Sequence, residues 1–116
     1  MEENANREID FLNKLATAYR TYDASVIEDH LSEDVHYASF WVFNELKSKA
    51  EYMEYLKGKL ETMKRTGKTF GFRIVFGRMH EYALLVLEEK VHCGFVVDFD
   101  SEGKVKMINM TTPEFF

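Results

Sequence analysis

The sequence predicts an α+β fold, in which a single domain, residues 1–116, wraps a curved antiparallel sheet around helices packed on its concave face. Up to residue 67 apolar residues recur at helical spacing, whereas from Lys68 onward they alternate along strands with a period of two. Because helices and strands occupy different halves of the chain, we expect them to segregate in the fold. The composition agrees, since 46% apolar residues with only 6 glycines and 1 proline is typical of a globular chain with one core.

Helical spacing begins near the N-terminus. The apolar face of a long first helix is expected at Ile9, Leu12, Leu15, Ala16 and Tyr19. A break at residues 21–23 lets Asp23 cap a short second helix. The Ser-Glu-Asp run at 32–34 predicts a turn before a strand from Val35 to about Ser39, and residues 41–43 either continue this strand or form a short hairpin.

A capping box starts the third expected helix. Ser48 and Glu51 have the spacing at which each side chain satisfies the free backbone N–H of the other residue. An apolar seam follows and ends at Thr66-Gly67, its members being Met53, Leu56, Leu60 and Met63. Gly58 costs this helix about 1 kcal/mol relative to alanine. We expect it to permit the close approach of a neighbouring backbone.

Strands fill the rest of the chain. Phe70, Phe72, Ile74 and Phe76 alternate with Thr69, Gly71, Arg73 and Val75, and further strands are expected over 82–89, 91–99 and 105–112. Asp100-Ser101-Glu102-Gly103 predicts a hairpin turn in which Gly103 takes a positive φ. With a helix across one face, such a sheet forms a cone with one open end.

Charge and composition exclude several classes of partner. The net charge of −5 argues against binding to nucleic acid, and the basic residues at 57–68 lie at a helix end, where cations suit the macrodipole. Cys93 is the single cysteine, which fits a reducing cytoplasm. The acidic N-terminus lacks the apolar core of a signal peptide, and the aliphatic run at 83–87 is too short to span a membrane. We therefore expect a cytoplasmic protein with no nucleic-acid or membrane partner.

The order of elements and three segments resemble the NTF2-like superfamily, which includes SnoaL-like and ketosteroid-isomerase-like domains. Asp23-Ala24-Ser25-Val26-Ile27 followed by residues 31–35 looks like the family's entry into its first strand, residues 46–60 are similar to its pocket-covering helix, and residues 99–105 look like its last hairpin. The resemblance implies a cone-shaped α+β barrel with an apolar pocket, frequently paired through the outer sheet face. Some members are enzymes, and others bind ligands or proteins.

The chemistry of ketosteroid isomerases does not carry over to this chain. When the ends of the first strand and the last hairpin are aligned, the family's general base falls on Ser39 and its oxyanion-hole carboxylic acid falls on Phe95. A serine hydroxyl is no base near neutral pH without an activating partner, and a phenyl ring donates no hydrogen bond. Ketosteroid-type isomerisation is therefore not supported, and no catalytic residue is assigned.

The sequence gives no metal site and no cofactor motif. The histidines, His30, His36, His80 and His92, lack a local ligand spacing, and the loop from Asp98 has Asn109 where a calcium loop requires glutamate. By strand parity His36 and His92 face the outer surface of the sheet. Cys93 shares the inward parity of Phe95, so we expect it to be a small buried apolar side chain.

Aromatic side chains from different elements predict a pocket where the cone converges. Tyr19, Tyr37, Ser39 and Tyr55 are expected to orient polar groups of a ligand, and Phe72, Phe95, Ile108 and Met110 to supply apolar walls. The first hypothesis is therefore a protein that binds a small apolar or aromatic molecule. We also expect a homodimer, because Cys93, Phe95 and Val97 alternate with Gly94 and Val96, so that both sheet faces are apolar.

Two other functions remain open on the sequence alone. One is a SnoaL-like isomerase, cyclase or dehydratase that acts on a hydrophobic carbonyl compound through tyrosine hydroxyls. A one-residue slip in strand register would bring Asp34, His36 or His92 into the pocket and favour this enzyme. The other is a protein-interaction module with a filled cone, which would contain no cavity.

Overall fold

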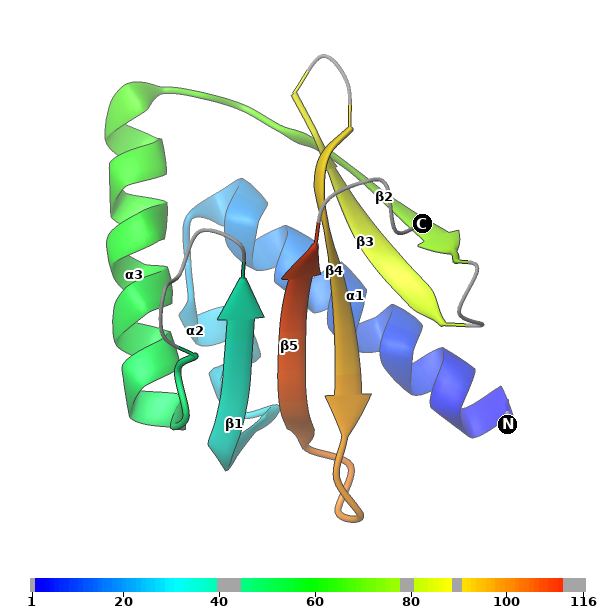
Figure 1. Ribbon diagram of the computed structural model, residues 1–116. Helices are drawn as coiled ribbons and strands as arrows, with labels where there is room; N and C mark the ends of the chain where they lie inside the picture. Colours follow the sequence, from blue (N-terminus) through cyan, green and yellow to red (C-terminus); the bar gives the residue numbers. More distant parts are fainter. Residues whose placement is uncertain (1, 40–44, 78–80, 89–90, 112–116) are drawn as a thin grey trace.

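Helices and strands follow each other in the predicted order, α-α-β-α-β-β-β-β (Figure 1). The computed structural model describes residues 2–39, 45–77, 81–88 and 91–111. The elements are α1 (Glu2–Thr21), α2 (Ser25–Glu28), β1 (Leu31–Ser39), α3 (Lys49–Thr66), β2 (Gly71–Phe76), β3 (Tyr82–Leu87), β4 (Val91–Phe99) and β5 (Val105–Thr111). The α+β class is confirmed. The prediction for residues 41–43 falls outside the described residues.

The strands form one curved sheet in the order β1-β5-β4-β3-β2. All neighbours are antiparallel except β1 and β5, which run in the same direction (Figure 1). The sheet is therefore mixed, whereas the sequence predicts a wholly antiparallel one. The difference has a topological reason: β1 and β5 are joined by a long connection through α3 and the three other strands, and such crossovers allow parallel pairing.

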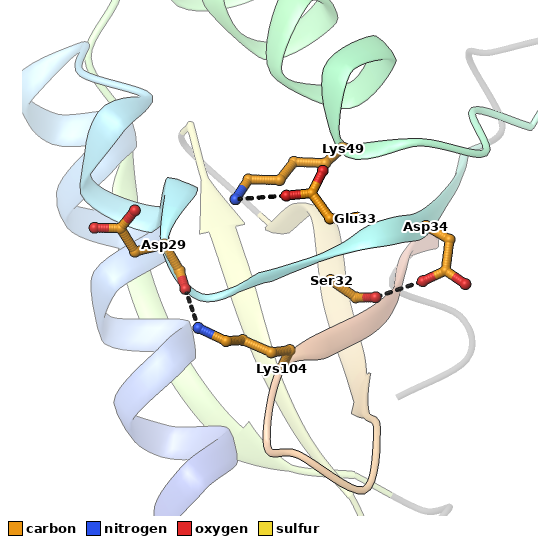
Figure 2. Close-up of polar contacts among 6 residues, drawn as sticks. All are labelled: Asp29, Ser32, Glu33, Asp34, Lys49 and Lys104. Carbon is orange, nitrogen blue, oxygen red and sulfur yellow. Dashed lines mark hydrogen bonds and ion pairs between the residues drawn. The ribbon is translucent and has the colours of Figure 1, made fainter.

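The first strand begins earlier than the sequence predicts. Leu31 pairs with Val105, and the N–H of Val105 donates to the carbonyl of His30 at 2.8 Å, so the Ser-Glu-Asp run at 32–34 is part of β1 and not a turn. A register shift follows between Leu31 and His36. The polar side chains of this run find partners outside the core, as Figure 2 shows for Ser32 with Asp34 and for Glu33 with Lys49.

Local signals place the ends of the helices close to the predicted positions. At the break after α1, Tyr22 adopts φ 56°. The cap position of α2 is Ala24, without a side-chain cap, although Asp23 Oδ1 accepts from the Ser25 N–H at 3.0 Å. Ser48 Oγ accepts from the Glu51 N–H at 3.1 Å at the start of α3, and the left-handed Gly67 (φ 70°) ends this helix.

The core lies between the helices and the inner face of the sheet. α1 packs against β2, β3 and β4, and α3 packs against β1. Fully buried side chains come from every layer, among them Leu12, Leu15, Leu56, Leu60, Leu84 and Ile108. Within the described residues, no helix is both long and apolar enough to cross a membrane.

Candidate ligand-binding pocket

A cavity of about 450 Å³ lies between α1, α3 and the inner face of the sheet. Its size falls within the range of about 300–1,000 Å³ that small-molecule sites occupy. The residues that line it are Tyr19, Tyr55, Lys59, Met63, Phe70, Val86, Cys93, Phe95 and Met110. Most of these side chains are aromatic, aliphatic or sulfur-containing, so the cavity offers an apolar surface with a few polar atoms.

Helix and strand periodicity explain how the wall is assembled. Tyr55, Lys59 and Met63 follow each other at intervals of four on α3 and therefore share one face. Cys93 and Phe95 alternate on β4, so both point to the inner side of the sheet. Tyr19 closes the cavity from the end of α1, with its ring centroid 5.7 Å from that of Phe95 and 6.2 Å from that of Phe72.

Four of the eight residues predicted to bind a ligand line the cavity. These are Tyr19, Tyr55, Phe95 and Met110. The other four lie elsewhere. Tyr37 is buried behind the wall, with its ring centroid 5.2 Å from that of Tyr55 and its hydroxyl 3.9 Å from Met110 Sδ. Ile108 is fully buried in the core, Ser39 is half buried at the end of β1, and Phe72 lines a neighbouring hollow.

The lining residue of most chemical interest, Lys59, is absent from the predicted set. Its Nζ lies 5.7 Å from the ring centroid of Tyr19 and 5.9 Å from that of Tyr55, which is cation–π range. Its ammonium forms no ion pair with a described residue. The sequence groups it with the basic residues at the end of α3, but its position four residues after Tyr55 is a signal that could have placed it on the pocket face.

Burial keeps the tyrosine hydroxyls of this region protonated. The pKa of Tyr19 is raised well above its ordinary value, first by burial and then by the neighbouring Tyr52, Tyr37 and Tyr55 hydroxyls. Burial likewise raises the pKa of Tyr37 and of Tyr52. At neutral pH these phenols therefore donate hydrogen bonds and do not act as bases.

Cys93 lies in the wall as strand parity predicts, and it is buried. Burial raises the pKa of its thiol, and the nearby Lys59 opposes this shift only in part. A thiol that resists ionisation is a weak nucleophile, because the thiolate is the reactive form. The arrangement favours packing over covalent chemistry at this position.

Groups able to accept a proton at neutral pH are absent from the described part of the lining, which contains no carboxylate and no imidazole. His36 points away from the pocket, and its Nδ1 lies 3.4 Å from Glu45 Oε1. His80 and the side chain of His92 fall outside the described part of the structure. Among the described residues, no three His, Cys, Asp or Glu side chains gather in a way that could hold a metal ion.

A second, smaller hollow of about 220 Å³ adjoins the cavity and shares Tyr19, Met63 and Phe70 with it. Arg20 and Lys68 supply its charges. The Arg20 guanidinium lies 5.0 Å from the ring centroid of Phe72. The two hollows therefore share part of their wall, and three cationic side chains, Lys59, Arg20 and Lys68, line them.

Comparison with solved structures identifies the fold. A SnoaL-like protein of unknown function from Burkholderia thailandensis superposes with a TM-score of 0.69 at 14% identity, over 90% of this chain and 93% of that one. An NTF2-like protein of unknown function from Burkholderia xenovorans gives 0.63 at 14%, over 93% and 85%. An LEH-like epoxide hydrolase from M. tuberculosis gives 0.53 at 13%, over 92% and 83%. No family model and no curated protein matches the sequence.

Proposed function

Since the chain has the NTF2-like fold, whose sequence segments it resembles, we propose that it binds a small apolar or aromatic molecule in the cavity between α1, α3 and the sheet. The observation that carries this proposal is the cavity itself, which has a volume of about 450 Å³ and a mostly apolar and aromatic lining. Tyr19, Tyr55 and Lys59 are the lining residues that carry an oxygen or nitrogen in the side chain, and such sparse polar groups in an apolar wall are typical of ligand pockets.

Binding is better supported than the two alternatives. A SnoaL-like isomerase, cyclase or dehydratase needs a proton acceptor, and the described lining contains phenols, a thiol and an amine but no carboxylate and no imidazole. The epoxide hydrolase that shares this fold does not assign its activity to this chain, because one fold supports many functions. An interaction module with a filled cone would leave no space where the cavity of about 450 Å³ lies.

Native mass spectrometry of the purified protein, compared with a denatured sample, tests the proposal. We expect an apolar molecule that leaves on denaturation, and we expect Phe95→Asp to lose it because an apolar ligand would strip water from the new carboxylate without replacing its hydrogen bonds. Phe76→Asp is the matched control, since Phe76 is 58% exposed and lies outside the cavity.

A second variant keeps the test informative if Phe95→Asp fails to fold. Cys93→Phe fills part of the cavity with an apolar ring and adds no charge, so loss of the ligand in this variant reports lost volume. Circular dichroism establishes that each variant is folded. A ligand retained by both folded pocket variants would contradict binding in this cavity.

A further inference from the structure

We infer that the ligand of this pocket is an acid, an apolar body that carries one carboxylate, and that Lys59 pairs with the carboxylate. The inference rests on the proposed function and adds the chemical class of the ligand. The charged side chains that line the cavity and the adjoining hollow are all positive among the described residues. Lys59 lines the cavity, Arg20 and Lys68 line the adjoining hollow, and no described acidic side chain lines either one.

Among the described residues, the cation in the main cavity has no acidic partner to neutralise it. Lys68 Nζ lies 3.4 Å from Glu88 Oε1, whereas Lys59 forms no ion pair with the residues that the structure describes. Lys59 is only half buried and its stem lies along the aromatic wall. An ammonium at an apolar wall that forms no ion pair within the described residues can pair with an anion that arrives with the ligand.

The neighbouring tyrosines bring no negative charge that would oppose this preference. Tyr19 and Tyr55 flank the ammonium, with ring centroids 5.7 Å and 5.9 Å from Nζ. The phenol of Tyr19 stays protonated well above neutral pH, so it offers a donor and no negative charge. A carboxylate accepts charge-assisted hydrogen bonds, which suits an ammonium held over two aromatic rings. A cationic ligand would meet Lys59 with like charge.

A pair of probes that differ only in charge tests the inference. Titration calorimetry at pH 7 and low salt compares 2-naphthoate with its neutral amide, 2-naphthamide. We expect the wild-type protein to bind the acid roughly tenfold more tightly, a difference typical of one charge-assisted hydrogen bond. The preference should shrink as salt is added, because the ammonium is partly exposed. Decanoate with decanamide repeats the comparison for a flexible acyl body.

Lysine variants assign the preference to one side chain. Lys59→Met removes the charge and keeps an apolar stem, so we expect it to bind acid and amide equally. Lys59→Arg should retain the preference. Lys57→Met is the matched control, because Lys57 is exposed on the same helix outside the cavity, and it should behave as wild type.

The outcomes separate this inference from the proposed function. Equal wild-type binding of acid and amide, or an acid preference that survives in Lys59→Met, would overturn the role of Lys59 and leave pocket binding intact. Failure of all four probes to bind would count against the pocket as a ligand site and would overturn both proposals.

Discussion

Gly58 lies in the middle of α3, yet nothing in the structure requires a glycine there. The sequence predicts that it permits a close approach of backbone, and this is wrong: beyond the adjacent residues and the backbone of α3 itself, a Cβ built at this position meets no heavy atom of the described residues within 4 Å. Gly67, at the end of the same helix, is different, because it adopts φ 70°, a conformation that L side chains rarely take. One glycine therefore weakens the helix, and the other ends it.

Substitution of these two glycines should have opposite effects. We expect Gly58→Ala to raise the free energy of unfolding by about 1 kcal/mol, because alanine restricts the unfolded chain and favours the helix. Gly67→Ala should lower it by about 1 kcal/mol, because a side chain strains the left-handed cap. Urea denaturation of both variants measures the difference. A destabilised Gly58→Ala would mean that this face of α3 is covered in solution.

Individual pocket residues were predictable only where a periodic pattern fixes their direction. Strand parity correctly places Phe95 and Met110 inward, and helical spacing does the same for Tyr19. Parity cannot tell a side chain that lines a cavity from one that packs beneath it, so the buried Ile108 was indistinguishable from a wall residue. Lys59 escaped notice because a lysine on a helix is ordinarily solvated, and only tertiary packing brings it over two tyrosine rings.

At the level of elements, the packing of α1 on the sheet brings acidic groups together. Glu8 of α1 and Glu81, just before β3, both have a raised pKa, above the ordinary value of 4.5, chiefly because burial disfavours the charged carboxylate. Asp98 of β4 raises both further by its charge. The folded state therefore binds protons more tightly than the unfolded state just above pH 4.5, and this contribution to stability is lost as pH rises through the raised pKa values.

Removal of one of these charges should stabilise the fold at neutral pH. We expect Glu81→Gln to raise the melting temperature at pH 7, where the wild-type carboxylates are ionised, and to lose this advantage near pH 4, where they are protonated. Thermal unfolding followed by circular dichroism across this range measures the effect. Glu61→Gln, at an exposed position on α3, is the control and should show no such gain. An advantage independent of pH would refute the electrostatic explanation.

The elements themselves were largely predictable, whereas their pairing was not. Caps and periodicity are local, so Ser48, Gly67 and the turn at Gly103 (φ 83°) mark real boundaries. The start of β1 was missed because Ser32, Glu33 and Asp34 favour turns when read locally, whereas in the sheet Leu31 and His36 on either side of them pair with β5 and keep this run within the strand. The parallel alignment with β5 joins residues far apart in the sequence, and no short-range pattern encodes it.

At the scale of the whole molecule, the charge of the pocket contrasts with that of the protein. The chain carries a net charge of −5, while the cavity and its adjoining hollow are lined by cations alone among their described charged residues. Long-range attraction therefore does not favour an acid, and the recognition that we infer at Lys59 acts at contact distance. Both terms enter the acid preference of the wild-type protein, and salt screens both. Because Lys59→Met and Lys57→Met change the net charge equally, the difference between these two variants reports the local term.

The homodimer stays a prediction, and its basis is the apolar outer face of the sheet. Val75, Leu85, Val96 and Met107 are only half buried there, which leaves an apolar surface opposite the cavity. We expect sedimentation velocity to give twice the mass of one chain at micromolar concentration, and we expect Val96→Glu to shift the protein to the monomer. A monomeric mass of the wild type across the micromolar range would contradict the dimer.

The pairing of β1 with β5 also fixes the order of events during synthesis. Leu31 emerges from the ribosome early, but its partner Val105 emerges only after every other strand has been made. Until then the inward side chains of β1, Val35 and Tyr37, lack the strand that completes their cover. The same delay applies to the cavity, whose wall joins Tyr19 near one end of the chain to Met110 near the other. A ligand therefore meets a finished pocket and cannot guide the early steps of folding.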